Sequence, residues 1–286
     1  MDLSIERVFQ VLDLAVSDLQ EHPIDLLNIG DHDGERAYLE NARPSYRRTL
    51  LDVTKVCARE KTQNRPIRVL EIGAFLGVVS FSLARLGMQV TALDIPEFMT
   101  NERLQERYRQ FAIGPVAFNL KDYELPFDSG SFDVVIMCET LEHLNFNPLP
   151  VIAEINRVLH TDGHLYLALP NLVSLPNRIN LLRGRSIHNP ISDFAVQLSA
   201  RANMIVGLHW REYTRSELLE MLSMTGFKCI SHVYEMPVRA SRLASLLYRL
   251  FPTLRPGQNL LAKKWQSTRC LFSTQRRPWP DGGMME

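Results

Sequence analysis

The stretch VLEIGAFLGVVS, residues 69–80, decides the predicted fold. An apolar run of strand length leads to Gly73, and a helix-like segment starts after Gly77. Glycine at these two positions lets backbone N–H groups and a helix N-terminus approach a ligand closely. Phe75 stands between them, where such loops most often carry another glycine. The stretch therefore predicts a strand, a ligand-binding turn and a helix in succession.

Further apolar runs alternate with helical segments along the middle of the chain. The predicted strands are 67–73, 89–95, 116–120, 132–138 and 163–169, with 228–236 and 258–265 as closing strands. Continuous apolar strands separated by helices are typical of a parallel sheet covered on both faces. We therefore predict an α/β fold, a doubly wound and mostly parallel seven-stranded sheet.

Glycines and capping residues mark the ends of the predicted helices. The helices cover 78–87, 97–111 and 148–163, and the third is expected to end with Gly163 as its C-cap. A further helix starts after Thr214 or Ser216 and stops at Gly226.

Two N-terminal helices are predicted, at 4–20 and around 46–60, with a polar, glycine-containing stretch between them. Residues 171–210 are rich in Asn, Arg, Ser and Pro, which indicates a lid or substrate-side insertion. We therefore divide the chain into an N-terminal helical cap (1–64), a main domain (65–268) that contains this insertion, and a flexible tail (269–286).

The overall composition is that of an ordinary globular protein. The formal net charge is zero, which gives no general reason to expect a nucleic-acid partner. The four cysteines are far apart and form no CxxC, so a reducing compartment fits best. The N-terminus lacks a basic and then apolar leader, and no continuous apolar run is long enough to span a membrane. We therefore expect a cytoplasmic protein.

An acidic residue follows the turn at the distance that a nucleoside ligand requires. Asp94 ends the second strand, 21 positions beyond Gly73. A carboxylate there can accept hydrogen bonds from both ribose hydroxyls of an adenosine. The GxGxxG fingerprint and the GxxxxGK[ST] motif are both absent, which disfavours NAD binding and ATP hydrolysis.

The segments VLEIGAFLG, VTALDI, LPFDSGSFDVVIMCETLEH and INRVLHTDGHLYLALPN, in this order, resemble the core of the class I S-adenosylmethionine-dependent methyltransferases. The chain is most similar to the branch that contains the ubiquinone-biosynthesis O-methyltransferases and the type 11 and type 23 methyltransferases. The resemblance covers about residues 65–235 and implies a Rossmann-like fold and S-adenosylmethionine as the cofactor.

The resemblance also implies roles for individual residues. Glu71, Gly73, Ala74 and Gly77 would border the methionine end of the cofactor. Asp94 would hold the ribose, Ile95 would flank the adenine, Asp122 would face the adenine amino group, and Cys138 would lie beneath the sulfonium. An acidic rim suits a cofactor that is cationic at sulfur.

The segment ETLEHL, residues 139–144, supplies the candidate catalytic groups. Glu139, Glu142 and His143 follow a strand end at i, i+3 and i+4, so on a helical turn they would share one face. Histidine can take a proton from a hydroxyl near neutral pH. Two carboxylates and an imidazole could also hold a divalent metal, with His209 of HWREYTR as a further ligand, because E-x-x-EH is similar to the metal motif of the small-RNA 2′-O-methyltransferases. A purely structural role is the third alternative. We favour the base and predict no metal.

A basic amphipathic stretch spans residues 238–255. Its arginines accompany an apolar stripe of Leu243, Leu246, Leu247 and Leu250. Such a stripe could contact a membrane surface, although we favour packing against its own domain.

The sequence thus predicts a methyltransferase that modifies a hydroxyl oxygen of a small molecule or saccharide. One alternative is an RNA 2′-O-methyltransferase with a divalent metal, which the neutral charge disfavours. Another is a catalytically silent binding or scaffold protein, for which Phe75 is the main argument.

Overall fold

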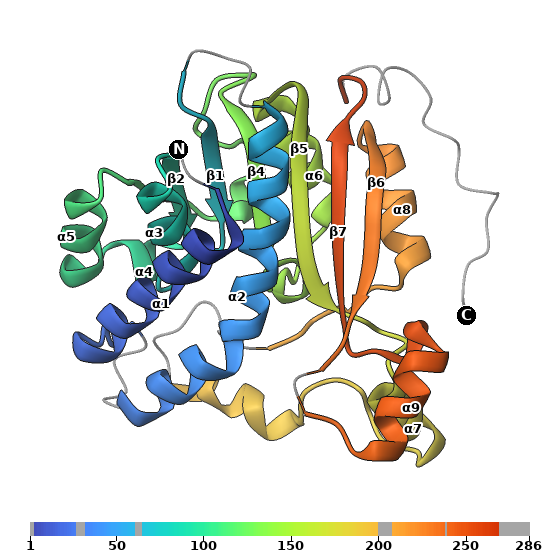
Figure 1. The fold of residues 1–286 in the computed structure, drawn as a ribbon. Helices are drawn as coiled ribbons and strands as arrows, with labels where there is room; N and C mark the ends of the chain where they lie inside the picture. The colour runs from blue at the N-terminus through green and yellow to red at the C-terminus, as the bar shows by residue number, and fades with distance from the viewer. Residues whose placement is uncertain (1–2, 27–31, 61–64, 200–207, 238, 269–286) are drawn as a thin grey trace.

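One seven-stranded sheet organises the protein (Figure 1). The computed structural model describes residues 3–26, 32–60, 65–199, 208–237 and 239–268. The strands are β1 (Arg68–Ile72), β2 (Gln89–Asp94), β3 (Gly114–Ala117), β4 (Phe132–Cys138), β5 (Leu159–Pro170), β6 (Phe227–Glu235) and β7 (Gly257–Lys264). Their order in the sheet is β3-β2-β1-β4-β5-β7-β6. The pairs from β3 to β5 are parallel, whereas β7 is antiparallel to β5 and β6. The predicted fold class is confirmed.

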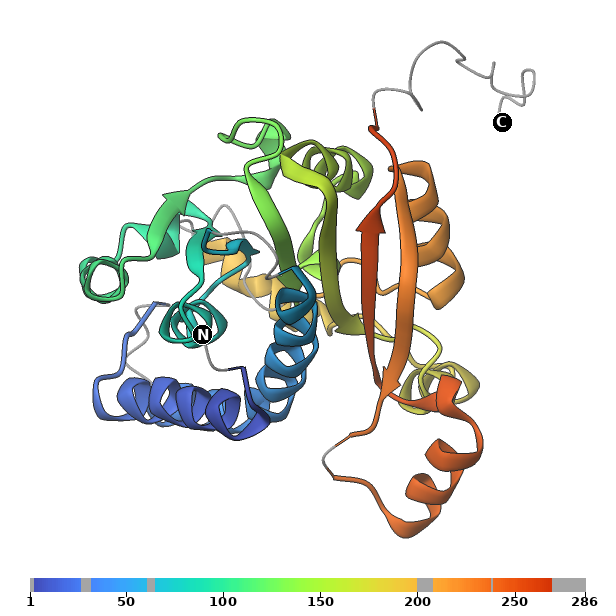
Figure 2. The same ribbon diagram turned by 45° about the horizontal axis from the view of Figure 1, so that its top comes forward.

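Helices cover both faces of the sheet (Figures 1 and 2). One hydrophobic cluster joins the sheet to α1 (Ile5–Glu21), α2 (His32–Glu60), α3 (Val78–Arg85), α4 (Pro96–Met99) and α5 (Glu102–Gln110). A second cluster joins the other face to α6 (Pro148–Val158) and α8 (Arg215–Met224). None of the described helices is long and apolar enough to cross a membrane.

The two N-terminal helices belong to the same core as the sheet. Val8 and Leu12 of α1 and Leu50 of α2 are buried together with Val69 of β1 and Phe81 of α3. The domain boundary that we predict at residue 64 therefore runs between segments that share one hydrophobic cluster.

The polar stretch predicted between the first two helices was placed wrongly. Within the described residues, α2 already begins at His32 and continues through Pro44. A proline inside a helix removes one backbone hydrogen bond. Burial of Leu39, Leu50 and Val53 offsets that loss, because these side chains pack into the shared core.

Two further helix predictions were also inaccurate. The single helix expected over 97–111 is divided into α4 and α5, and Asn101 caps the second by accepting a hydrogen bond from the Leu104 N–H at 3.1 Å. The helix expected to end at Gly163 stops at Val158, and Gly163 lies within β5. A Cβ at Gly163 would lie 2.8 Å from the His160 carbonyl oxygen, so glycine is required there by packing and not by a helix end.

The remaining elements lie near the carboxyl ends of the parallel strands (Figure 1). They are α7 (Leu175–Leu182), α9 (Arg242–Leu250) and four 3₁₀ turns, η1 (Leu120–Asp122), η2 (Leu141–His143), η3 (Ile191–Ser199) and η4 (Pro252–Leu254). The helix predicted in the insertion is α7. The tail predicted after residue 268 lies outside the described residues.

The prediction that the apolar stripe of residues 238–255 packs against its own domain was wrong. In α9 only Tyr248 is buried, and Leu243, Leu246 and Leu250 are exposed. Leu247, the fourth residue of the stripe, is half-buried, so most of the stripe is exposed among the described residues.

Candidate active site

The turn between β1 and α3 requires glycine at both predicted positions. Gly73 and Gly77 adopt φ angles of 76° and 73°. A Cβ at Gly73 would lie 2.0 Å from Oγ1 of Thr140, and one at Gly77 would lie 2.9 Å from the rings of Phe81 and Tyr108. Both glycines thus combine a left-handed backbone with a close approach of neighbouring side chains.

Phe75 adopts a φ of 45°, unusual for an aromatic residue. Its N–H donates to Oδ2 of Asp94 at 2.7 Å, which fixes the turn to the end of β2. Its ring packs edge-on against Tyr38 of α2 and Phe98 of α4, with centroid distances of 5.4 and 5.3 Å. Phe75 therefore joins the turn to two helices.

Asp94 is placed to accept further hydrogen bonds. Its Oδ1 accepts the Ile95 N–H at 2.7 Å, and Oδ2 accepts Phe75. Each carboxylate oxygen has a second lone pair, so two hydroxyl groups can still donate to this side chain. Burial raises the pKa of Asp94 to about 6.

Glu71 lies beneath the same turn. It is buried, and its Oε2 accepts a hydrogen bond from Oγ of Ser80 at 2.5 Å. Burial raises its pKa to about 8, against the smaller opposing effect of Ser80. The sequence did not single out Ser80, although it lies in the first turns of α3, where it can reach a carboxyl on β1.

The end of β4 brings Cys138 and Glu139, two of the predicted residues, to the same edge of the sheet. Cys138 is half-buried, with its Sγ 3.6 Å from Oγ1 of Thr49. Glu139 adopts a φ of 48° and its N–H donates to the Ala168 carbonyl at 2.7 Å. A non-glycine residue in this conformation is strained, and such strain is concentrated at functional sites.

Glu142 is completely buried in η2. Among the described residues, the carboxyl of Glu139 is its side-chain partner, and no amide, hydroxyl or cationic donor of another residue reaches either carboxyl oxygen of Glu142 at hydrogen-bond distance. Burial, followed by the negative charge of Glu139, holds the pKa of Glu142 well above its usual range. A desolvated carboxyl of this kind gains from a cation or a donor that binds beside it.

Two histidines face Glu142. Nδ1 of His143 lies 2.8 Å from the Leu208 carbonyl, so we assign the proton to Nδ1 and the lone pair to Nε2. That Nε2 is 3.9 Å from Oε1 of Glu142. Burial lowers the pKa of His143, which favours the neutral imidazole. The ring of His209 lies 5.0 Å from that of His143.

His209 is oriented by acceptors on the insertion side. Its Nδ1 lies 3.3 Å from Oε1 of Glu212, and Oε2 of Glu212 accepts the Asn177 amide at 2.7 Å. One ligand atom each of Glu142, His143 and His209 lies within 4.8 Å of the others. Glu139, which precedes η2, is not part of that group. The expected helical face is therefore replaced by a cluster of two residues from η2 and one from HWREYTR.

Ile95 and Asp122, to which the resemblance assigns contacts with the adenine, follow the ends of β2 and β3. Ile95 is buried at the end of β2, and Asp122 is exposed in η1 after β3. The remaining predicted residue, Ala74, is buried in the turn, and its N–H donates to the Leu93 carbonyl at 3.3 Å.

Sequence reasoning missed the contribution of α2. The side chains of Tyr38 and Tyr46 are hydrogen-bonded to each other, and the charges of Glu139 and Glu71 act on them. Burial raises the pKa of Tyr46 well above its usual range. Positions 38, 46 and 49 follow helical spacing, but the polar stretch around Pro44 hid the part of the helix before residue 46.

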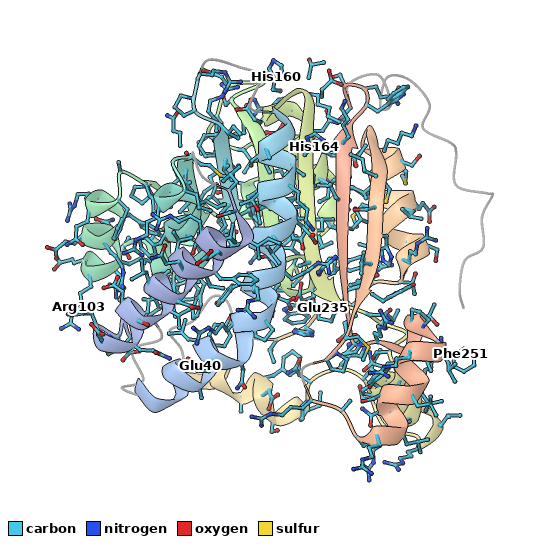
Figure 3. All side chains as sticks on the ribbon, viewed as in Figure 1. Glu40, Arg103, His160, His164, Glu235 and Phe251 are labelled. Atoms are coloured by element: carbon cyan, nitrogen blue, oxygen red, sulfur yellow. The ribbon has the colours of Figure 1, made fainter. Side chains whose placement is uncertain are left out.

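A cavity of about 260 Å³ lies beside α2, lined by Arg48, Glu235, Arg255 and Asn259 among others. Figure 3 shows Glu235 at the end of the sheet opposite His160 and His164. The carboxyl ends of the parallel strands are at the Glu235 end, so this cavity and the carboxylate–histidine cluster lie at the same end of the sheet.

Residues 70–167 match the family described as "Methyltransferase domain". The similarity to this family is limited to these residues. The sequence-based resemblance is thereby confirmed, and the family implies S-adenosylmethionine as the cofactor. The match covers β1 to β5, with the turn and the carboxylate–histidine segment of η2.

The ubiquinone biosynthesis O-methyltransferase of Xanthomonas oryzae pv. oryzae is 36% identical over 105 residues. That alignment covers 36% of this chain and 43% of the relative, so less than half of the relative's length is spanned. The Xanthomonas campestris pv. campestris protein of the same name is 35% identical over the same length.

Solved structures show the same fold. A SAM-dependent methyltransferase of Methanosarcina mazei has a TM-score of 0.50 and 22% identity, over 73% of this chain and 97% of that one. An S-adenosylmethionine dependent methyltransferase of Mesorhizobium loti has a TM-score of 0.50 and 14% identity, over 78% and 97%. At these identities the likeness concerns the fold alone.

Proposed function

We propose that this protein is an S-adenosylmethionine-dependent O-methyltransferase that acts on a hydroxyl group of a small molecule. The names of the Xanthomonas relatives support oxygen as the acceptor. A saccharide hydroxyl presents the same chemistry and belongs to the same proposal.

One observation carries the proposal: the imidazole of His143 follows the end of β4, at the same sheet edge as the glycine turn, with Nδ1 2.8 Å from the Leu208 carbonyl and Nε2 on the side of Glu142. His143 is held by the Leu208 carbonyl, and burial lowers its pKa. A base of this kind can take the proton from an acceptor hydroxyl while the oxygen becomes the nucleophile.

The residues of the turn fit the cofactor. S-adenosylmethionine supplies a methyl group on a positively charged sulfur. Asp94 retains lone pairs for two ribose hydroxyls. Burial raises the pKa of Glu71 to about 8 and that of Glu139 to about 7, and a cationic cofactor bound beside them would favour their charged forms. Catalysis would depend mainly on positioning, with the acceptor oxygen held in line and its proton passed to Nε2 of His143.

Calorimetry with S-adenosylmethionine and transfer of its labelled methyl group to a panel of phenols, sugars and amines would test this proposal. We expect cofactor binding and transfer to hydroxyl acceptors. His143→Ala should lower kcat by roughly 100-fold while leaving cofactor affinity unchanged. Transfer to amines alone would refute the choice of oxygen. Absence of cofactor binding would favour the scaffold alternative.

We also propose, as a second candidate, that Glu142, His143 and His209 hold a divalent cation. The orphaned carboxyl of Glu142 is the observation that favours it. Both imidazoles direct Nδ1 to an oxygen acceptor, Leu208 or Glu212, which is how metal-binding histidines are usually oriented. Such a cation would act as a Lewis acid on an acceptor hydroxyl.

Metal analysis separates the two candidates without an activity assay. Purified protein would be stripped with a chelator, loaded with Mn²⁺ and examined by electron paramagnetic resonance. A bound metal predicts that His209→Ala and His143→Ala reduce Mn²⁺ affinity alike. If neither variant changes the spectrum, the metal candidate fails while the base proposal stands.

A further inference from the structure

Helices α7 and α9 expose a set of large apolar side chains at one corner of the molecule. Figures 1 and 2 both show the two helices side by side, and Asn171, just before α7, donates its side-chain amide to the Thr253 and Arg255 carbonyls after α9, both at 2.8 Å. We call this corner the α7/α9 surface. Its exposed apolar residues are Leu181, Leu182, Leu243, Leu246, Leu250 and Phe251.

The exposure is too large for ordinary surface leucines. Leu182 is 87% exposed, Leu250 is 62% exposed and Leu246 is 53% exposed. Leu243, Leu246 and Leu250 follow helical spacing, so they form one stripe along α9. Figure 3 shows Phe251 at the end of α9, where it points away from the body of the molecule. Large apolar side chains exposed along one helix in this way mark an interaction site.

The two segments that carry α7 and α9 hold charges of one sign. The segments 171–190 and 236–256, which carry α7 and α9, contain no Asp or Glu. Their exposed arginines are Arg178, Arg183, Arg185, Arg239, Arg242 and Arg249. Leucine and phenylalanine beside arginine are the composition of elements that lie in the interface of an anionic bilayer.

The position of the surface relates it to the candidate active site. It lies at the carboxyl end of the parallel strands, as the site does (Figure 1). Asn177 of α7 donates to Glu212, which in turn orients His209. The same helix thus contributes to both the exposed corner and the carboxylate–histidine cluster.

We propose that the α7/α9 surface docks the protein on an anionic lipid membrane, with leucines and Phe251 entering the interface and arginines contacting lipid phosphates. The candidate active site then lies at the bilayer side of the molecule. Docking itself does not depend on the proposed methyl transfer, and only its benefit to catalysis rests on that function.

Vesicle flotation with the full chain tests the proposal. We expect binding to phosphatidylcholine vesicles that contain phosphatidylglycerol, little binding to phosphatidylcholine alone, and loss of binding in high salt. Leu246→Glu should weaken partitioning by at least roughly tenfold. Arg249→Ala should weaken it roughly fivefold.

Two matched variants control for a general effect of the substitutions. Leu14→Glu changes a 48% exposed leucine of α1, and Arg109→Ala changes an exposed arginine of α5. Both should bind vesicles like the unchanged protein. Calorimetry with S-adenosylmethionine and circular dichroism would confirm that every variant is folded, independently of methyl transfer.

Three results would overturn the proposal. The first is equal binding, or no binding, to vesicles with and without phosphatidylglycerol. The second is a loss in Leu14→Glu as large as that in Leu246→Glu. The third is concentration-dependent self-association in sedimentation velocity that Leu246→Glu abolishes, which would assign the surface to a second copy of this chain.

Discussion

Replacement of Gly73 by alanine should disrupt the turn that defines the candidate cofactor site. At a φ of 76°, a residue with a Cβ loses about 1–2 kcal/mol relative to its ordinary conformation. The added methyl group would also lie 2.0 Å from Oγ1 and 3.0 Å from Cβ of Thr140. Relief of such an overlap typically costs about 1–3 kcal/mol. The two effects together predict a loss of about 2–5 kcal/mol in the free energy of unfolding.

Two other glycines separate these effects. Gly184 has a φ of 67°, but a Cβ there would meet no described atom within 4 Å, so Gly184→Ala should show only the backbone effect. Gly114 has neither restriction, because its φ is not left-handed and the nearest atom would be 3.8 Å away. The predicted order of stability is Gly114→Ala, then Gly184→Ala, then Gly73→Ala.

Thermal unfolding and calorimetry with S-adenosylmethionine are the appropriate assays. Each kcal/mol should shift the melting temperature by about 2–4 °C in a domain of this size. Cofactor affinity should fall by at least roughly tenfold in Gly73→Ala alone. Thr140→Ala should partly rescue Gly73→Ala, because it removes Oγ1 and Cγ2 but leaves Cβ. If Gly73→Ala has the same melting temperature as Gly184→Ala and binds the cofactor with unchanged affinity, the steric reasoning is wrong.

Three further predictions concern charges and a helix cap. Asp133→Asn should lower the free energy of unfolding by about 2 kcal/mol at neutral pH. The reason is that the Asp133 carboxylate accepts hydrogen bonds from Nη1 and Nη2 of Arg65 at 2.6 and 2.7 Å. Burial raises the pKa of Asp133, but the hydrogen bonds from Arg65 and Arg68 have a larger opposite effect and hold it below its ordinary value of 3.8. The loss caused by Asp133→Asn should therefore shrink progressively in urea unfolding as the pH falls from 3.8 towards the lower pKa of the folded state. Burial raises the pKa of Glu71 from 4.5 to about 8. Its contribution to the free energy of unfolding is therefore full below pH 4.5 and is lost as the pH rises through 8. Glu71→Gln should flatten the measured dependence of stability on pH in this window. Thr214→Ala should lower the free energy of unfolding by about 1 kcal/mol, because Thr214 and Glu217 form a capping box at α8, and chemical denaturation would check this value.

The sheet could be predicted from the sequence because each buried strand carries its own signal. The apolar runs ending at Ile72, Asp94 and Cys138 are flanked by polar or glycine-containing turns. The apolar pattern and the length of each run therefore both indicate a buried strand. Thr214 and Gly226 likewise mark the start and the end of α8 by their own residue types. In these segments local preference and tertiary packing favour the same structure.

The errors occurred where packing overrides local preference. Pro44 suggests a helix boundary, yet α2 continues through it because its apolar face is buried against the sheet. Gly163 resembles a helix end, but it is required by the closeness of the His160 carbonyl within a strand. Neither reason is visible in the residues next to these positions.

The candidate site was partly predictable for the same reason. Asp94, Glu142 and His143 lie at strand ends that the sheet topology brings to one edge. His209 came only from a resemblance of motifs, because it lies 66 residues after His143 and reaches the cluster through the backbone contact of Trp210 with Glu142 at 2.8 Å. Tyr38 was missed because the predicted helix started only around residue 46, and Tyr46 was not singled out within that helix.

Phe75 illustrates how a departure from a motif can carry structural information. A third glycine would leave the turn without a side chain to contact the helices above it. Phe75 instead places a ring between Tyr38 of α2 and Phe98 of α4, while its N–H still holds Asp94. The aromatic side chain therefore links the N-terminal helices to the predicted ribose-binding carboxylate, so a change in the position of α2 would be transmitted to Asp94 through a single residue. This link gives the aromatic residue a packing role in the turn, and it makes Phe75 an argument for a candidate site that α2 helps to shape.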